Sequence, residues 1–319
     1  MTRDRGGAGA TLARQAARGL PQSGAVRRVA RPAPADQLAA RAAAENFPVA
    51  LRLLPRRHRD HLAAIYNFAR TVDDVGDECE PAERLPLLAE LDADLGGLSA
   101  GQRSGATGAQ AQASRPMHPA VRGLAAVVAD CQIPMALFHD LITANKQDQV
   151  VSRYETFDDL LGYCRFSANP VGRIVLHVFG CSTPQRAVLS DSICSGLQII
   201  EHLQDVAEDH RAGRIYLPAA DIRKYGCTEQ DLMAASASPQ LRCLIAAEAE
   251  RARALIVSGS PLVGELRGAA RIAVAGYIAG GRAALAALAS ADYDVLARMP
   301  RPARVRTVLE LVSALARGR

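Results

Sequence analysis

Acidic residues with a four-residue spacing are the strongest chemical signal in this sequence. Glu201, Asp205 and Asp209 recur in this way within the stretch that begins at Gln198. Side chains four residues apart lie on one face of a helix, so the three carboxylates would stand above one another. Like charges at this spacing repel each other and destabilise an isolated helix. The arrangement therefore indicates either a solvated helix face or a bound counter-ion.

A second acidic group occurs about 130 residues earlier, where Asp73 and Asp77 repeat the four-residue spacing. Mg²⁺ prefers carboxylate oxygens and often shares its sites with substrate phosphates. Two facing acidic groups would therefore form an oxygen-lined site for Mg²⁺ bound to a diphosphate. An alternative for the first group is an intrahelical ion pair of Arg70 with Asp73 or Asp74, although such a pair leaves Asp77 and Tyr66 unexplained.

Cations accompany both acidic groups. Arg70 lies beside the first group, and Arg211 and Arg214 follow the second. Arginine can hold phosphate oxygens in a bidentate fork. The chain has no glycine-rich loop of the ATP-binding type, which argues against phosphoryl transfer from ATP. Metal-assisted departure of a diphosphate from a carbon skeleton, in an apolar cavity, is the expected chemistry.

The elements that would position these groups are all helical. Alanine, leucine and arginine dominate the composition, aromatic residues make up only 4% of it, and no strand of convincing period appears. Residues 36–319 are therefore expected to form one all-α domain, a helical bundle. Helices are expected at about 36–47, 60–77, 81–98, 121–130, 134–144, 185–211, 239–258, 266–291 and from about 305 to the end.

One further helix is expected to begin after Thr156, because Thr156 and Asp159 have the spacing of a capping box. Pro170 and Gly172 interrupt this helix, since proline removes a helical hydrogen bond and glycine removes a side chain. A bend at a cavity wall is one explanation, and a kink needed only for packing is the other. The polar residues 146–154 in front of this helix suit a lid or substrate loop.

The basic charge of the chain belongs to its first 35 residues. Seven arginines and one acid give this tail a charge of +6, whereas the whole chain has +5. The tail is expected to be disordered, and peripheral contact with the inner face of the membrane is one role for it. Residues 99–119 are rich in glycine, serine and glutamine and are expected to form a long loop.

The remaining composition narrows the class of protein. No apolar run reaches the eighteen or so residues needed to span a bilayer, and residues 269–288 are interpreted as a buried core helix. The seven cysteines contain no Cys-x-x-Cys pair. An odd number without a secretory signal predicts reduced thiols and a cytoplasmic location. No nucleic-acid partner is expected.

Three stretches resemble a known family, the squalene and phytoene synthases. They are residues 65–77 (Ile-Tyr-Asn-Phe-Ala-Arg-Thr-Val-Asp-Asp-Val-Gly-Asp), 204–209 (Gln-Asp-Val-Ala-Glu-Asp) and 213–218 (Gly-Arg-Ile-Tyr-Leu-Pro). The resemblance covers roughly residues 38–298 and implies the all-α isoprenoid synthase fold, with helices around a central apolar cavity. Residues 45–49, residues 163–172, Arg282 and the Tyr293 region look most like the bacterial hydroxysqualene synthase branch, which serves hopanoid-type squalene supply.

The resemblance also implies roles for individual residues. The metal-binding acids would be Asp73, Asp77, Asp205 and Asp209, with Glu201 at a position where the family usually has asparagine. The diphosphate-binding residues would be Arg70, Arg214, Gln198 and Lys146. Tyr66 and Tyr163 match cavity tyrosines that can steady a cation or the leaving group.

Departures from ordinary squalene synthases indicate the substrate. Glu45 and Asn46 replace their Ser/Arg/Lys-type diphosphate contacts, and Ser167-Ala-Asn-Pro170 replaces their Val-Ala-Gly bend. Coupling of two farnesyl diphosphates needs two diphosphate sites, so these changes favour one preformed substrate. The expected reaction is Mg²⁺-dependent conversion of presqualene diphosphate to hydroxysqualene. The absence of a dinucleotide fingerprint agrees with an alcohol product that NADPH does not reduce.

Two alternatives of different kinds remain open. Another activity of the same fold would couple two prenyl diphosphates, as presqualene diphosphate, squalene, dehydrosqualene or phytoene synthases do. A non-catalytic helical protein would bind a prenyl lipid or a pathway enzyme, although a binding module has no need for four metal-poised acids.

Overall fold

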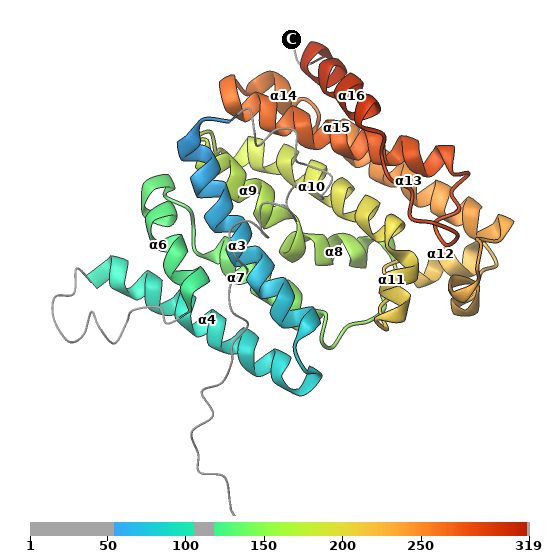
Figure 1. Cartoon of the computed structure of the whole chain (residues 1–319), viewed down its shortest axis with the longest axis horizontal. Helices are drawn as coiled ribbons and strands as arrows, with labels where there is room; N and C mark the ends of the chain where they lie inside the picture. The colour runs from blue at the N-terminus through green and yellow to red at the C-terminus, as the bar shows by residue number, and fades with distance from the viewer. Residues whose placement is uncertain (1–53, 105–117, 318–319) are drawn as a thin grey trace, which may run out of the picture.

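The computed structural model describes residues 54–104 and 118–317, and helices account for most of them (Figure 1). The first helices are α3 (Arg56–Glu78), α4 (Pro81–Ser104), α6 (Pro119–Cys131), α7 (Ala136–Gln147), α8 (Phe157–Ser167) and α9 (Asn169–Val178). They are followed by α10 (Pro184–Gln204), α11 (Val206–Arg211), α12 (Ala219–Lys224), a 3₁₀ turn (Glu229–Met233), α13 (Pro239–Gly259), α14 (Leu262–Glu265), α15 (Gly268–Ser290) and α16 (Arg304–Arg317). Within the described ranges the β-type pairing is one isolated bridge, between Arg153 and Ile215. The expected all-α class is confirmed.

Two expected boundaries were wrong. Helix α3 begins at Arg56, directly after Pro55 and four residues before the expected start, so the basic residues 56–59 form its first turn. Proline has a fixed φ that suits a helix start, which explains the earlier beginning. Helix α4 continues to Ser104, inside the segment expected to be a loop. No proline interrupts residues 99–104, and a packed helix propagates at little cost. The rest of that loop and the expected helix at 36–47 lie outside the described residues, as does the basic tail.

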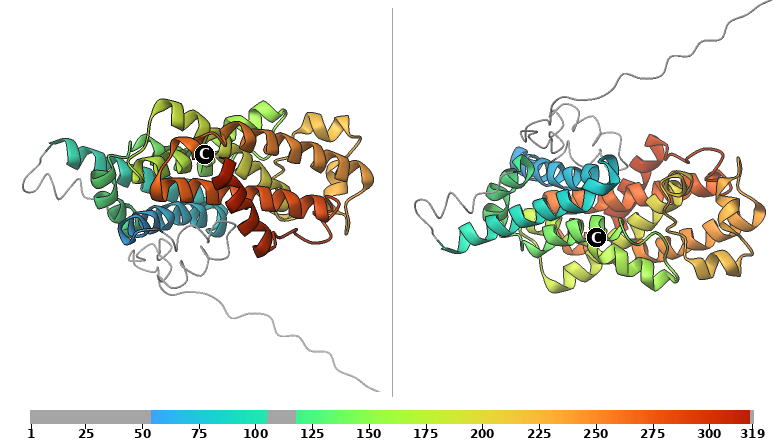
Figure 2. Two further views of the ribbon diagram at one scale, coloured as in Figure 1. Left: turned by 90° about the horizontal axis from the view of Figure 1, so that it is seen from above. Right: turned by 90° about the horizontal axis from the view of Figure 1, so that it is seen from below.

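Two apolar clusters form the core, and α9 joins them. The first cluster lies among α3, α4, α6 and α7, where the rings of Phe68 and Phe138 meet edge to face at 5.5 Å. The second cluster lies among α8, α10, α13 and α15. Ile174 belongs to the first cluster and Leu176 to the second. Figure 2 shows α3 and α4 toward one end of an elongated molecule and α12 and α13 toward the other.

The helix expected after Thr156 is interrupted where the sequence indicates. Thr156 and Asp159 form the capping box, with each side chain bound to the other's backbone N–H. The helix ends at Ser167, and α9 restarts at Asn169 with Pro170 in its first turn. Gly172 then faces α10 so closely that a Cβ would overlap Ser190 and Cys194. The interruption therefore brings α9 against the helix that precedes the second acidic group.

Helix α15 is a core helix, as expected. Of the described helices it alone is long and apolar enough to cross a bilayer by length and composition, but most of it is buried inside the fold. Ala275, Ile278 and Leu288 are fully or almost fully buried. It contacts α10, α13 and α14, and α16 lies along its remaining side. Its apolar character is thus explained by packing within the protein.

Candidate active site

The first acidic group lies on the last two turns of α3. The opposite face of this helix is buried through Phe68, Val72 and Val75, which leaves Asp73 and Asp77 exposed to water. Arg70 forms an ion pair of 2.7 Å with Asp74 and a longer one with Glu78. The alternative of an intrahelical ion pair thus applies to Asp74 and leaves the four-residue pair Asp73 and Asp77 available to other partners.

Gly76 lies where α7 meets this group. A Cβ at Gly76 would overlap Oδ1 of Asn145, so glycine leaves room for the present position of the Asn145 side chain. From this position Asn145 donates a hydrogen bond of 3.1 Å to Asp73. Gln149 donates another, also of 3.1 Å, to the carbonyl oxygen of Gly76. The end of α7 therefore fixes the orientation of the first acidic group.

The Asp73 side chain is accessible to water and is also partly desolvated by neighbouring protein atoms. Desolvation raises its pKa to about 6, the hydrogen bond from Asn145 lowers it, and the neighbouring Asp77 raises it again. The side chain is nevertheless exposed. Asp73 therefore keeps contact with water while nearby protein atoms and Asp77 disfavour its charge. A carboxylate of this kind is stabilised when a cation approaches it.

The second acidic group is not on one continuous helix, so the expectation of a helix over 185–211 was wrong. Helix α10 ends at Gln204, Asp205 has φ −103° and ψ 12°, and α11 begins at Val206. The side chains of 202, 203, 204 and 206 are all buried. A straight helix would spread them over more than half its circumference. The bend at Asp205 accompanies the burial of all four side chains.

The three acids of this group remain near one another along the bend. Asp209 N–H still donates to the carbonyl oxygen of Asp205 at 2.8 Å. Desolvation and the charges of Asp209 and Glu208 raise the pKa of Asp205 to about 6. Glu201, one turn earlier, is half-buried. Desolvation and mutual repulsion are the conditions that a bound cation would offset.

Arg214 connects the two acidic groups. Gly213, with φ +84°, turns the chain after α11 and places Arg214 so that its Nη1 donates to Oδ1 of Asp77 at 2.9 Å. The arginine side chain is only 17% exposed. Its Nε is buried and has no hydrogen-bond partner among the described residues. An anion between the groups would supply the acceptor that this N–H lacks.

Four aromatic rings and one carboxylate form a cluster beside Arg214. Asp148, just beyond α7, accepts hydrogen bonds from the hydroxyls of Tyr163 at 2.7 Å and Tyr216 at 3.0 Å. Tyr216 also stacks on His202, with 3.7 Å between ring centroids, and Tyr154 packs against both tyrosines. Burial raises the pKa of Asp148, and the two tyrosine hydroxyls counter that rise.

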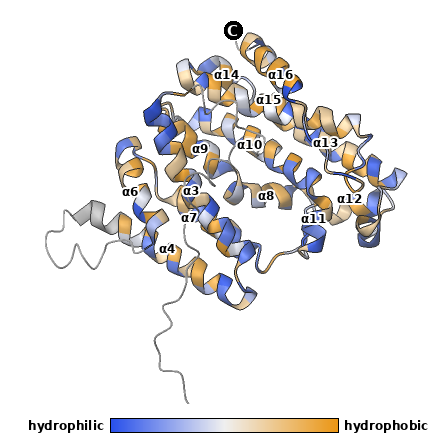
Figure 3. Cartoon of the chain, in the orientation of Figure 1, coloured by the Kyte–Doolittle hydropathy of each residue, from blue (hydrophilic) through white to orange (hydrophobic). Residues whose placement is uncertain are grey.

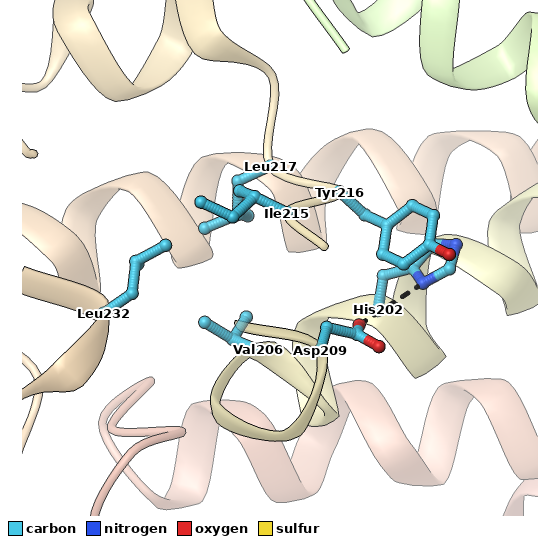
Figure 4. Close-up of a pocket in the computed structure, with 7 residues that line it drawn as sticks. All are labelled: His202, Val206, Asp209, Ile215, Tyr216, Leu217 and Leu232. Carbon is cyan, nitrogen blue, oxygen red and sulfur yellow. Dashed lines mark ion pairs between the residues drawn. The ribbon is translucent and has the colours of Figure 1, made fainter. Parts of the chain in front are cut away.

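The cluster reaches the second acidic group through His202. Figure 4 shows the stacked rings of Tyr216 and His202 above Asp209, and 3.8 Å separates His202 Nδ1 from Asp209 Oδ2. The pocket drawn there has a volume of about 10 Å³, enough for one water molecule but not for a prenyl chain. The large apolar cavity expected from the resemblance stays a prediction.

Lys146, Gln198 and Tyr66 were also expected in the site, and each has its own neighbours. Lys146 binds Asp92 of α4 at 2.5 Å, and His139 binds the same carboxylate, so the structure places Lys146 in a separate ion-pair cluster. Gln198 lies 3.3 Å from His202 and thus lines the second group. Tyr66 is half-buried one turn before Arg70.

No preformed metal cage is present among the described side chains. Nowhere in that part of the chain do three or more His, Cys, Asp or Glu side chains come close enough together to hold a metal ion. The donor set still fits Mg²⁺, which often takes one or two carboxylates and completes its shell with phosphate oxygens and water. The raised pKa values of Asp73 and Asp205 and the unpartnered Nε of Arg214 suit a cation and an anion that arrive together.

Asn145, Asp148 and His202 are the residues that sequence reasoning missed. Asp148 is the one acid in the polar segment 146–154, which was interpreted only as a lid or substrate loop. The presence of Asp148 and Tyr154 in one short segment could have indicated a functional carboxylate. The tyrosines that bind Asp148 are Tyr163 and Tyr216, which lie outside this segment. Nothing local to Asn145 or His202 predicts their contacts.

Comparison with known proteins shows which chains share this arrangement. A family model described as squalene/phytoene synthase matches residues 40–308, which include both acidic groups. Hydroxysqualene synthase of Rhodopseudomonas palustris is 38% identical over 226 residues, covering 70% of this chain and 72% of the relative. The crystal structure of squalene synthase HpnC from Alicyclobacillus acidocaldarius has a TM-score of 0.71 and 38% identity, covering 81% of this chain and 93% of that one. A dehydrosqualene synthase structure, at 24% identity and a TM-score of 0.74 over 89% of this chain and 95% of its own, shows the shared fold.

Proposed function

The chain belongs to the squalene/phytoene synthase family, and we propose that it converts presqualene diphosphate to hydroxysqualene and diphosphate. Members of this family are isoprenoid-synthesising enzymes that act on prenyl diphosphates, and the chain is accordingly an enzyme. The observation that supports the specific reaction best is the 38% identity to a hydroxysqualene synthase over 70% of the chain. The departures at Glu45, Asn46 and residues 167–170 support the same choice.

The charged residues would bind the leaving group. Asp73, Asp77, Glu201, Asp205 and Asp209 would hold Mg²⁺, which when bound neutralises charge that develops on the departing diphosphate. Arg214 has one N–H group on Asp77 and a buried Nε that is free to donate to a phosphate oxygen. It would therefore hold the diphosphate against the first acidic group.

The aromatic cluster would face the reacting carbon. When the carbon–oxygen bond breaks, the electron pair leaves with the diphosphate and a carbocation remains. The ring of Tyr163 can stabilise positive charge, and its hydroxyl is already bound to Asp148. Tyr216, which is stacked on His202, would support this arrangement through the same carboxylate. After rearrangement, the oxygen of a water molecule adds to the cation and releases one proton, which gives the alcohol.

Coupling of two farnesyl diphosphates is the second candidate, because the solved structure at 38% identity bears the name squalene synthase. The two reactions differ in the first substrate they consume. Purified protein is supplied with Mg²⁺ and either presqualene diphosphate or farnesyl diphosphate alone, and lipid extracts are separated by mass spectrometry. Hydroxysqualene from the first substrate and no consumption of the second support the proposal. Consumption of farnesyl diphosphate, or no hydroxysqualene from presqualene diphosphate, contradicts it.

Asp205→Asn tests whether the second acidic group takes part. The variant removes a charge that burial and Asp209 already disfavour, so the fold is retained while turnover falls at least about a hundredfold. Asp158→Asn is the matched control, since Asp158 is exposed in the first turn of α8. Circular dichroism verifies the helical content of both. Full turnover by folded Asp205→Asn would remove this acid from the mechanism.

A further inference from the structure

Helix α16 has two apolar faces, and the inner one fixes it to the protein. Ala314 is buried, and Leu311 and Leu315 pack against the larger core cluster. Arg271 of α15 donates a hydrogen bond of 2.7 Å to the carbonyl oxygen of Leu315. Figure 1 and both views of Figure 2 show α16 on the outside of the molecule. The helix is thus firmly attached along one side and open along the other.

The outer face of α16 is apolar and exposed. Val305, Val308, Leu309 and Val312 follow the spacing of one helix face and are 73%, 50%, 61% and 62% exposed. Figure 3 shows hydrophobic and hydrophilic residues alternating along α16. Single exposed apolar residues are ordinary in proteins. Four exposed apolar side chains on one face of a helix form a stripe, and contact of this stripe with water is unfavourable.

Arginines surround this stripe. Residues 298–317 contain five arginines (298, 301, 304, 306 and 317) and one acid, Glu310, so the segment has a net charge of +4. Arg304 and Arg306 flank Val305 and project about 100° to either side of the stripe, because successive helix residues differ by that angle. Arg306 also pairs with Glu310 at 3.0 Å. Glu310 offsets the charge of Arg306, and the segment that carries the stripe keeps its net positive charge.

We propose that α16 docks the protein on an anionic phospholipid bilayer. The outer valines and Leu309 would enter the boundary between headgroups and acyl chains, and the flanking arginines would contact the lipid phosphates. An amphipathic helix with a basic border lies in the plane of a membrane interface for these reasons. This site differs from the basic tail, which has the charge without an apolar stripe. The proposal does not depend on the reaction that the protein catalyses.

A second copy of the chain fits this face less well. A stable protein interface buries about 800 Å² on each partner, and four side chains on one narrow helix supply only part of that area. Two copies related by symmetry would also bring their basic borders together, which is unfavourable. An anionic lipid surface matches both the width of the stripe and the sign of its border.

Vesicle sedimentation of the full chain tests the proposal. Vesicles contain either phosphatidylcholine alone or an equal mixture of phosphatidylcholine and phosphatidylglycerol, without substrate. We expect binding to the anionic vesicles, and we expect Leu309→Ser with Val312→Ser to weaken it by about tenfold or more. Val188→Ser with Met233→Ser is the matched control, because these residues are 64% and 71% exposed outside the stripe. The control pair should bind like the unmodified protein.

Charge variants separate α16 from the tail. Arg304→Gln with Arg306→Gln should weaken binding to anionic vesicles, and added salt should weaken binding of the unmodified protein, since salt screens exposed charges. A full chain with glutamine at all seven tail arginines should retain most of its binding. Loss of binding in the tail variant alone would overturn the proposal. So would no vesicle binding by the unmodified protein, or a stripe variant that changes only the oligomeric mass in light scattering.

Discussion

Asp148 shows how much a single side chain can organise at this site. It accepts hydrogen bonds from two tyrosines, one on α8 and one in the segment after α11. The Tyr163 hydroxyl is thereby held in one orientation, and Tyr216 is held flat against His202. The two tyrosine hydroxyls also hydrogen-bond to each other. The carboxylate therefore positions both rings relative to the acidic groups.

Asp148→Asn is expected to lower kcat about tenfold to a hundredfold, in the range found for groups that orient catalytic residues. The two hydroxyls donate to different oxygens of Asp148, and in asparagine one of these oxygens is replaced by an N–H₂ donor, so one of the two hydrogen bonds is lost. KM should change little, because Asp148 does not bind the diphosphate. The product ratio is the decisive measurement: we expect less alcohol and more alkene when the tyrosines are loosely held.

Asp140→Asn is the control for this change, because Asp140 is a half-buried acid on α7, the helix that Asp148 follows, and it binds neither tyrosine. It should preserve both kcat and the product ratio. An unchanged product ratio and kcat in Asp148→Asn would show that the tyrosine positions do not depend on this carboxylate. Failure of either protein to make hydroxysqualene at all would instead count against the proposed reaction.

At the scale of elements, glycines set the distances between helices that carry the site. Helices α10 and α13 pack most extensively of all pairs. A Cβ at Gly196 would approach the carbonyl oxygen of Ala252, and one at Gly259 would overlap the carbonyl oxygen of Leu189. Backbone atoms cannot rotate away as side chains do, so the close packing of these two helices requires glycine at both positions.

Gly259→Ala should lower the free energy of unfolding by about 1–3 kcal/mol, the range for overpacked cores. Gly123→Ala on α6 is the matched control, because a Cβ there meets no atom within 4 Å. In that exposed helix position alanine should be neutral or stabilising by up to about 1 kcal/mol. Urea denaturation followed by circular dichroism measures both. Equal stability of the two variants would contradict the packing argument.

A buried acid between α12 and α13 gives stability a pH dependence. Desolvation and the charge of Asp221 raise the pKa of Glu248 to about 7. Arg251, which forms an ion pair of 2.8 Å with Glu248, lowers this pKa only in part. The folded state therefore keeps a proton that the unfolded chain releases above pH 4.5. Ionised Glu248 destabilises the folded state above pH 7, and this cost disappears as the pH falls toward 4.5.

Glu248→Gln should consequently raise the free energy of unfolding above pH 7 by up to about 3 kcal/mol, with little gain near pH 4.5. Arg251 keeps its ion pair with Asp221 in the variant. Denaturant titrations across this pH range provide the measurement, and Glu250→Gln, an exposed neighbour on α13, serves as control. A gain that does not change with pH would mean that packing, not ionisation, is responsible.

For the whole molecule, the fold class and the acidic groups could be predicted from the sequence, because helical periodicity and charge spacing are local. The position of the bend at Asp205 could not, since it depends on burying Leu203, Gln204 and Val206 together. The ion pair of Lys146 with Asp92, 54 residues earlier in the chain, could not be predicted either, and the expected role of Lys146 at the diphosphate stays a prediction. The contacts of Asp148 and Asn145 likewise arise only when α3, α7 and α8 have packed.

Cation and anion should bind the folded protein together. Because no three metal-ligating side chains converge among the described residues, Mg²⁺ alone should shift the melting temperature little. Mg²⁺ with inorganic diphosphate should raise it, since a ligand at a hundred times its Kd stabilises by about 2.7 kcal/mol. Scanning fluorimetry of the protein and of Asp205→Asn tests this. An equal shift with Mg²⁺ alone would show a preformed metal site.

The hydrogen bond between Arg214 and Asp77 joins residues that are 137 positions apart. During synthesis at about 5–20 residues per second, Asp77 is made roughly 7–27 seconds before Arg214. For that interval the nascent chain presents Asp73 and Asp77 without the guanidinium that later pairs with Asp77. The first apolar cluster can form in the meantime, but the diphosphate site has to wait for the second. The nascent protein would thus become able to bind diphosphate only late in synthesis. Diphosphate binding would then indicate that the parts of the protein around the two apolar clusters have packed together.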